Sequence, residues 1–345
     1  MTVRAQGNFL VIDGSVWRTE LGRWSDRLAY RPLRLATIFA RMRLDVELRR
    51  YVGALPRLDE QSVVARAGEL PAGGYVAMAA ADVDMDGRTE LVMVRAADVT
   101  VLRVSPARGA LRIEHVARLD FPSGTPTAPS RRRRVVASAR GDGDGVVLRT
   151  SEHARTFRLG WQEDHPELAP AQSSCAQDLF PMGDACARLV EGRDFFEPRV
   201  LERGVEHETP GSFYTRVARP IRTAEGGTVL YEAIVTPHGR LAARAGDRPI
   251  GAAGYGASLA LADLDDDGSP ELLTSSARNV GAGDQLALLR ILPRGALHVV
   301  WRSPELEGSV LVTCAADVDD DGVEEMLAIE EPAGTGARAR LWVLR

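Results

Sequence analysis

The chain has 345 residues, more than one compact core of about 100–150 residues needs, so its length allows two or three domains or one large repetitive domain. Hydrophobic residues make up 45% and charged residues 26%, which is ordinary for globular proteins and excludes a disordered chain. All 43 basic residues are arginine and the net charge is −5. The lack of lysine excludes Schiff-base, pyridoxal-phosphate and P-loop chemistry, and the negative charge argues against general nucleic-acid binding.

The first predicted element is a hairpin near the N-terminus. The apolar run Phe9–Ile12 is followed by Asp13-Gly14 and then by Val16–Leu21, and an Asp-Gly pair between two short runs favours a tight turn between strands. The run Phe9–Ile12 is too short for the apolar core of a secretory signal. Farther along, Leu33–Leu55 carries apolar residues at helical spacing, so a helix is as well supported there as a pair of strands.

An internal repeat dominates the rest of the chain. Three segments align: YVAMAAADVDMDGRTELVMV from Tyr75, YGASLALADLDDDGSPELLT from Tyr255 and SVLVTCAADVDDDGVEEMLAI from Ser309. Each has an apolar run, the acidic loop Asp-x-Asp-x-Asp-Gly-x-x-Glu and a second apolar run. A fourth, decayed copy, RGDGDGVVL from Arg140, lacks the first and last acids. The repeat predicts that one structural unit is used several times.

The spacing of the repeats predicts the architecture. Asp82 and Arg140 lie 58 residues apart, and Asp263 and Asp317 lie 54 apart. A period near 50 with four short strands per unit is typical of a propeller blade. The sequence therefore predicts an all-β fold, a single β-propeller of four-stranded blades over 1–345, with seven blades or, alternatively, six. The clearest blades are expected at 72–121, 131–162, 250–306 and 307–345, and 8–21 is expected to complete the last blade, so that N- and C-terminal strands close the ring.

One long segment breaks the repeat and is predicted to be an irregular insertion, about 163–211. It contains Cys175 and Cys186, for which a disulfide and two reduced thiols are both open, while Cys314 lies in an apolar run. It also contains Phe195 and Phe196, which are either an exposed binding anchor or local core.

The acidic loops are candidate metal sites. Carboxylates at positions 1, 3, 5 and 9, with a glycine for the turn at position 6 and a backbone carbonyl at position 7, offer the hard oxygen ligands that Ca²⁺ prefers. Four acids in one loop without a cation would repel one another. We therefore predict about three calcium sites. Their ligands are Asp82, Asp84, Asp86, Arg88 and Glu90; Asp263, Asp265, Asp267, Ser269 and Glu271; and Asp317, Asp319, Asp321, Val323 and Glu325.

The segments DVDMDGRTEL, DLDDDGSPEL and DVDDDGVEEM resemble the FG-GAP/VCBS repeats of integrin-α-like β-propellers. Gly74-Tyr75 and Gly254-Tyr255 stand where that family has Phe-Gly. The resemblance implies a calcium-stabilised propeller that is extracytoplasmic (periplasmic, cell-surface or secreted), with its signal peptide absent from this chain, and that binds proteins or glycans.

No catalytic motif is found: the sequence lacks HExxH, GxSxG and a dinucleotide-binding glycine pattern. The expectation is therefore a non-enzymatic scaffold that binds a protein partner. The alternatives are a glycan-binding propeller and a polysaccharide-acting enzyme on the same fold. A lectin should repeat aromatic platforms from blade to blade, whereas a lyase should gather arginine, histidine and tyrosine at the mouth of the ring.

Overall fold

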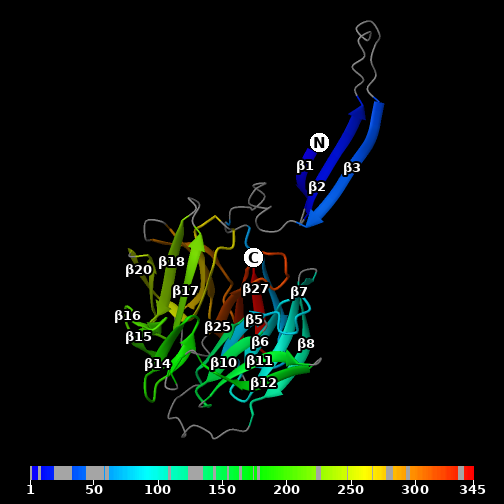
Figure 1. Cartoon of the computed structure of the whole chain (residues 1–345). Coiled ribbons are helices and arrows are strands. Elements are labelled where there is room, and N and C mark those ends of the chain that lie inside the picture. The colour runs from blue at the N-terminus through cyan, green and yellow to red at the C-terminus, as the bar shows by residue number, and fades with distance from the viewer. Residues whose placement is uncertain are drawn as a thin grey trace. The chain divides into compact units, whose positions relative to one another are not determined.

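The computed structural model consists of strands and connecting turns (Figure 1). It describes residues 2–6, 9–18, 33–43, 58, 62–107, 110–122, 135–142, 145–153, 155–162, 165–173, 175–176, 179–222, 227–246, 248–265, 267–276, 283–292, 296–332 and 338–345. The chain divides into two compact units, one formed by Met1–Pro56 with Asp321–Val323 and the other by the rest of the chain. No described helix is long and apolar enough to cross a membrane.

Within the first unit, three strands form one antiparallel sheet in the order β1-β2-β3. Their bounds are Thr2–Gln6, Phe9–Arg18 and Leu33–Arg43. The Asp13-Gly14 pair does not form the predicted hairpin, because β2 runs through it and Gly14 pairs with Ile38 inside the ladder. The open question over Leu33–Leu55 is resolved as a strand for its first part, and the remainder lies outside the described residues.

The second unit is a ring of six four-stranded antiparallel sheets, which confirms the propeller and selects six blades over the favoured seven. The first two blades are β5–β8 (Ala77–Ala81, Glu90–Val94, Asp98–Ala107, Ala110–Asp120) and β9–β12 (Ala137–Gly141, Val146–Thr150, Thr156–Gln162, His165–Ala171). The next two are β13–β16 (Leu179–Met182, Ala185–Leu189, Phe196–Glu202, Val205–Glu208) and β17–β20 (Thr215–Arg222, Thr228–Val235, Arg240–Ala245, Arg248–Ala253).

The last two blades are β21–β24 (Tyr255–Ala262, Glu271–Ser276, Leu286–Ile291, Leu297–Arg302) and β25–β27 (Gly308–Ala316, Glu325–Pro332, Arg340–Leu344) with β4 (Ala65–Glu69). The ring closes where β4 pairs with β27, as in Arg340↔Glu69 and Leu344↔Ala65. An early strand thus completes the last blade as expected, but it is Ala65–Glu69 and not 8–21, which pairs within its own sheet.

The first strand of every blade faces the axis of the ring. Strand β5 contacts β9, β9 contacts β13, β17 contacts β21, β21 contacts β25, and β25 contacts β5. The bridge Phe196↔Phe213 joins the β13–β16 blade to the start of the next one. Apolar clusters fill the spaces between adjacent blades, so the core is divided into wedges around the ring.

The segment predicted to be an insertion, 163–211, holds the regular blade β13–β16. Cys175 and Cys186 form a disulfide, with Cα atoms 5.6 Å apart. Phe196 is 1% exposed and packs on Phe180 and Phe213. Of the two interpretations of the phenylalanine pair, local core is therefore correct for Phe196. Phe195 makes an edge contact with Tyr214.

Candidate functional site

The acidic loops lie where the repeat predicts them, between the first and second strands of three blades. In each loop the glycine at position 6 has a positive φ: 84° for Gly87, 83° for Gly268 and 85° for Gly322. These are left-handed conformations that glycine adopts without steric strain. The glycine therefore allows the tight turn that brings the acids together, as the sequence indicates.

The acids of each loop come close enough to hold a cation. Asp82, Asp84 and Asp86 form one such group, and two further groups are Asp263, Asp265 and Glu271, and Asp317, Asp319 and Glu325. Within each group, one carboxylate oxygen per residue lies within 4.8 Å of the others. Three of the predicted ligand acids, Glu90, Asp267 and Asp321, are not in these groups.

The loop backbone already uses several of the predicted ligands. The glutamate at position 9 accepts a hydrogen bond from the N–H of position 2, at 3.0 Å for Glu90 and Val83 and at 2.9 Å for Glu325 and Val318. The position-7 residues donate their backbone N–H to the aspartate at position 5. These pairs are Arg88 and Asp86 (3.0 Å), Ser269 and Asp267 (2.8 Å), and Val323 and Asp321 (3.0 Å).

Burial changes the acidity of the position-9 glutamates. Removal from water raises the pKa of the Glu271 carboxyl to about 8, with Asp265 adding to the effect and Arg290 opposing it. The pKa of Glu325 is also raised to about 8, chiefly by burial, while Arg345 opposes the shift. Charged groups removed from water need a hydrogen-bonded partner of opposite sign. In all three loops such a partner is an arginine of the same blade.

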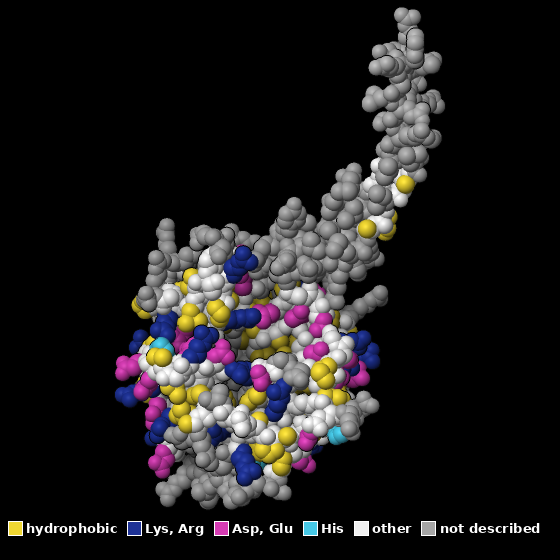
Figure 2. Space-filling view, viewed as in Figure 1, with side chains coloured by type: hydrophobic (Ala, Val, Ile, Leu, Met, Phe, Trp, Pro, Cys, Tyr) yellow, Lys and Arg dark blue, Asp and Glu magenta, His cyan; other side chains and the backbone are white. Residues whose placement is uncertain are grey.

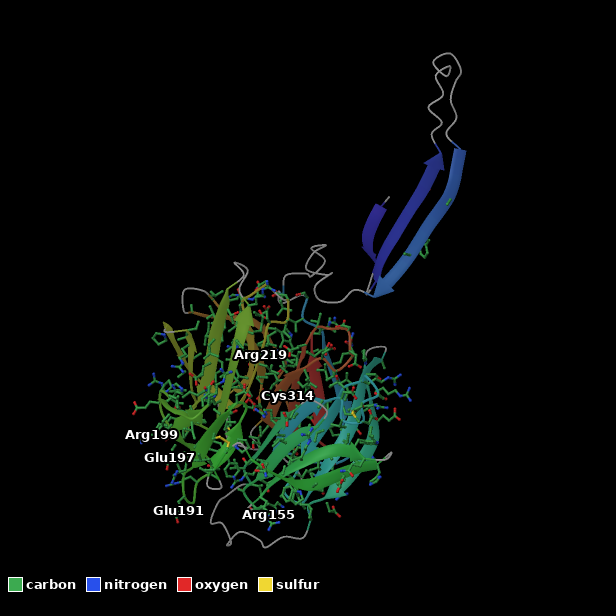
Figure 3. All side chains as sticks on the ribbon, viewed as in Figure 1. Arg155, Glu191, Glu197, Arg199, Arg219 and Cys314 are labelled. Carbon is green, nitrogen blue, oxygen red and sulfur yellow. A yellow bond between two sulfur atoms is a disulfide. The ribbon has the colours of Figure 1, made fainter. Side chains whose placement is uncertain are left out.

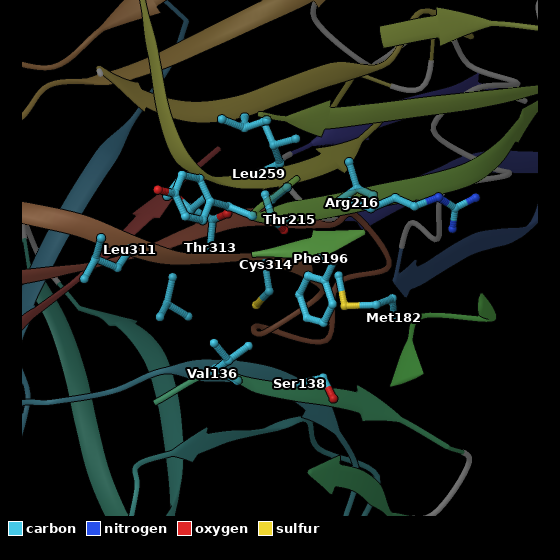
Figure 4. Close-up of a pocket in the computed structure, with 18 of the residues that line it drawn as sticks. Val136, Ser138, Met182, Phe196, Thr215, Arg216, Leu259, Leu311, Thr313 and Cys314 are labelled. Carbon is cyan, nitrogen blue, oxygen red and sulfur yellow. The ribbon is translucent and has the colours of Figure 1, made fainter. Parts of the chain in front are cut away.

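The second candidate site is the axial cavity, defined as the space enclosed by the innermost strands β5, β9, β13, β17, β21 and β25. Its volume is about 1830 Å³, and Figure 4 shows residues of several blades around it. Figure 3 places Cys314 toward the middle of the ring, whereas Glu197 and Arg199 lie at its outer edge. A concave space where several elements meet is the usual place for a small-molecule site.

Three serine and threonine side chains on the wall of the axial cavity have unsatisfied hydroxyls. They are Ser138 on β9, Ser258 on β21 and Thr313 on β25, here called the inner-strand hydroxyls. Their oxygens are withdrawn from solvent and have no hydrogen-bond partner among the described residues. Buried polar groups in native proteins are nearly always bonded. Such groups on three blades around one cavity are candidate hydrogen-bond partners for a bound molecule.

Charged and titratable side chains share the axial cavity. Arg216 is buried, and its Nε and Nη2 donate to Glu232 (2.5 Å) and Glu202 (3.0 Å). Arg219 pairs with Glu324 at 2.5 Å. Burial raises the pKa of the Cys314 thiol to about 12, so this cysteine is a neutral thiol and not a nucleophile at neutral pH.

The cavity also carries the residue types that the sequence search did not bring together. Tyr214, Tyr255 and His238 line it along with Arg216 and Arg219. Tyr214, Arg216 and Arg219 lie within six residues at the start of β17, but Tyr255 and His238 come from other segments, and no known motif marks the set. One signal was available for the inner-strand hydroxyls: a single Ser or Thr interrupts the apolar first run of a blade, as in YGASLALA and VLVTCAA.

Comparisons with known proteins concern the fold alone. No protein-family model and no curated protein sequence matches the chain, so the FG-GAP/VCBS resemblance is not confirmed. Among solved structures, the PQQ-bound aldose sugar dehydrogenase of Streptomyces coelicolor is 10% identical, with a TM-score of 0.44, covering 83% of this chain and 100% of that one. A putative oxidoreductase (glucose dehydrogenase) of Thermus thermophilus is 12% identical, with a TM-score of 0.38 and coverages of 82% and 100%. AofleA of Arthrobotrys oligospora is also 12% identical, with a TM-score of 0.36 and coverages of 78% and 83%.

These findings correct the expectation of a non-enzymatic scaffold. Two of these three solved structures are named as sugar dehydrogenases, which is said of those proteins. A binding module without activity is accordingly not retained. The binding of a protein partner stays a prediction.

The cofactor named for the Streptomyces protein does not fit the axial cavity of this chain. PQQ carries three carboxylates, which need several cationic groups held together. Here four arginines line the wall, Arg193, Arg203, Arg216 and Arg219, and two of them, Arg216 and Arg219, are already paired with glutamates. Five carboxylate residues line the same space, namely Asp184, Asp194, Glu202, Asp284 and Glu331. No step of a reaction is therefore derived through this cofactor.

Proposed function

We propose that the protein is an enzyme that acts on a carbohydrate bound in the axial cavity. The observation that carries the proposal is the set of inner-strand hydroxyls, which are buried, without partners among the described residues and contributed by three blades. A sugar offers several hydroxyl groups that both donate and accept, as serine and threonine hydroxyls do. Rotation of Ser138, Ser258 or Thr313 about χ1 would turn its oxygen toward the cavity.

The energetics favour a hydroxyl-rich ligand. A buried hydroxyl without a partner costs about 1–3 kcal/mol, and a ligand that supplies the missing partner recovers part of that free energy on binding. A site built on such groups also rejects analogues that lack the matching hydroxyl, because its own polar groups then stay unpaired. The wall between these groups is apolar, with Leu259, Leu311 and Val136 shown in Figure 4. Apolar walls with a few polar groups are typical of small-molecule sites.

The reaction class that the lining supports is proton transfer at a sugar carbon or oxygen. His238, Tyr214 and Tyr255 are general acid–base types. Arg193 and Arg203, which also line the cavity, supply positive charge for an acidic sugar. This is the set that a polysaccharide lyase would need in one place. Cys314 contributes no covalent step, because its raised pKa keeps the thiol neutral.

The test is a screen of neutral and uronate-containing polysaccharides with two readouts. Ultraviolet absorbance detects the unsaturated product of elimination. A reducing-end assay detects chain cleavage by elimination or by hydrolysis. The triple variant S138A/S258A/T313V should raise KM about 10-fold or more, since each lost hydroxyl contributes about 0.5–1.5 kcal/mol. The matched control is S105A, an exposed serine on β7. Absence of product in both readouts across the panel, or equal kinetics of the triple variant and the control, would refute the proposal.

A further inference from the structure

The acidic loops carry an independent inference about the cation they hold. The spacing of the acids predicts calcium, and that prediction depends on the need to neutralise four acids in each loop. In the structure the acids of each loop meet a guanidinium from their own blade. The arginines are Arg103 for the loop at Asp82, Arg290 for the loop at Asp263, and Arg345 for the loop at Asp317.

In the first two loops the contacts repeat residue for residue. Arg103 lies on β7 directly across from Glu90 on β6, and Arg290 lies on β23 directly across from Glu271 on β22. In both, Nε donates to the position-9 glutamate at 2.7 Å. Nη2 donates to the position-3 aspartate, at 2.6 Å for Asp84 and 2.5 Å for Asp265.

The position-5 aspartates complete the pattern. Arg103 Nη2 also donates to Asp86 at 2.7 Å, and Arg290 Nη1 lies 3.8 Å from Asp267. One planar guanidinium therefore spans three carboxylates, which its fork of donors allows and a lysine ammonium could not reproduce. The third loop uses Arg345, whose Nη1 is 3.0 Å from Asp319 and 3.4 Å from Glu325.

In the first two loops the backbone uses most of the remaining oxygens, and the buried Asp82 Oδ1 is the exception without a hydrogen-bond partner among the described residues. At position 1, Asp82 accepts the Gly87 N–H at 2.9 Å, and Asp263 accepts the Gly268 N–H at 2.8 Å. Asp265 also accepts the N–H of Leu58 at 2.7 Å. In the loop at Asp263 the side chains of Asp265, Glu271 and Arg290 are 2%, 0% and 8% exposed. A calcium ion could reach them only by displacing a buried guanidinium, which would be left without its partners.

The three arginines occupy equivalent positions in their sheets, although they lie at different distances along the chain from their loops. Arg103 follows its glutamate by 13 residues, Arg290 by 19 and Arg345 by 20, because the connections between the second and third strands differ in length. Arg345 comes directly after Leu344, which pairs with Met326, the neighbour of Glu325. Three arginines at unequal sequence distances thus reach one place in the blade.

We infer that the resident cation of these acidic loops is the arginine of the same blade and not calcium, so that the motif serves as a metal-independent connection between three strands and their loop. The loops then need no metal to fold. Removal of the arginine should expose a latent cation site, because the four acids would lose their counter-charge while keeping their geometry. Figure 2 shows basic and acidic side chains interspersed over the visible face of the ring.

The experiment uses the full chain and CaCl₂ as the probe. For the native protein, melting temperatures in EDTA and in millimolar CaCl₂ should agree, and calorimetric titration with CaCl₂ should give no heat of binding. R103Q should melt lower in EDTA by at least about 3 °C and should regain stability in CaCl₂, with a dissociation constant of about 10⁻⁴–10⁻³ M. Arg103 is chosen because its side chain is 25% exposed, so its loss is more easily tolerated than that of Arg290.

The matched control is R302Q, an exposed arginine on β24 whose described hydrogen bond goes to Gln285. This variant should behave as the native protein in both solutions. A native melting temperature that falls in EDTA and returns with calcium would overturn the inference, and so would an R103Q protein that is as stable in EDTA as the native one. If R103Q does not fold, the native protein's calorimetry and metal content after dialysis against CaCl₂ still decide: bound calcium refutes the inference and its absence supports it.

Discussion

Ring closure by β4 can be tested with a pair of proline substitutions one residue apart. Val64 and Arg345 exchange both backbone hydrogen bonds, at 2.6 and 3.1 Å, and the Leu70 N–H donates to the Ala339 carbonyl at 2.9 Å. In an antiparallel pair such bonds alternate along the strand. The N–H of Arg66 therefore faces Val343 on β27, whereas the N–H of Ala67 faces the open side of the outermost strand.

The expected effects differ because only one of the two N–H groups is used. R66P removes a ladder bond, worth about 1 kcal/mol, and leaves the carbonyl of Val343, which is 6% exposed, without its donor, which costs about 1–3 kcal/mol. We expect R66P to lower the free energy of unfolding by about 2–4 kcal/mol relative to R66A. A67P should lower it by at most about 1 kcal/mol, because proline is tolerated on edge strands where its nitrogen faces outward.

Urea denaturation measures the difference. With an m-value of about 3 kcal/mol/M, a loss of 2 kcal/mol moves the midpoint down by about 0.7 M. R66A serves as the reference that removes the side chain while keeping the N–H. Equal midpoints for R66P and A67P would show that this strand does not close the ring in the register described, and an unchanged R66P would refute closure by β4.

Three further predictions concern buried groups. R216A should lower the free energy of unfolding by about 3 kcal/mol in the same urea assay, because it breaks a buried ion pair with Glu232. R244A removes the second, partly exposed partner of Glu232 and should lower it by about 1 kcal/mol or less. Burial against Phe121 and Phe157 lowers the pKa of His153, and a hydrogen bond to the Ala96 backbone opposes this shift. Below about pH 6.5 the unfolded chain therefore binds the proton more readily than the folded one, so stability should fall as the pH drops through this range. The melting temperature of H153F should fall less steeply with acid than that of the native protein, and an equal acid dependence would show that His153 is charged in the folded state. The half-buried Cys314, whose thiol pKa is raised to about 12 by desolvation, should react with a disulfide reagent at pH 8 far more slowly in the native protein than in urea, and equal rates would contradict the raised pKa.

The acidic repeats located the blades that carry them, because each loop fixes a turn between two apolar strands. They could not count the blades. The β13–β16 blade joins its first two strands by a short turn at Gly183-Asp184, and the β17–β20 blade does so by a long hairpin, so neither carries the motif. The expectation of a single propeller of seven blades over 1–345 also included the first 56 residues, which belong to the other unit.

The closing strand and the cavity were invisible for different reasons. Strand β4 reads ARAGE and is only half-buried along its length, so it lacks the apolar alternation that marks a strand in sequence. The inner-strand hydroxyls come from three distant segments, and only the ring brings them to one wall. The arginine partners of the loops were likewise hidden, since their distance from the motif varies while their position across the sheet does not.

The pairing of β4 with β27 also has a consequence for the order of folding. Arg338 and Glu69, which form an ion pair beside this seam, are 269 positions apart in the chain. Contacts of such long range form late, because the entropy of closing the intervening loop must be lost first. During synthesis the five complete blades can fold as they emerge, while β4 waits with an unpaired edge for the final hairpin. The pairing of β4 with β27 is thus the step at which slow folding, or pairing with a second nascent chain, would first appear.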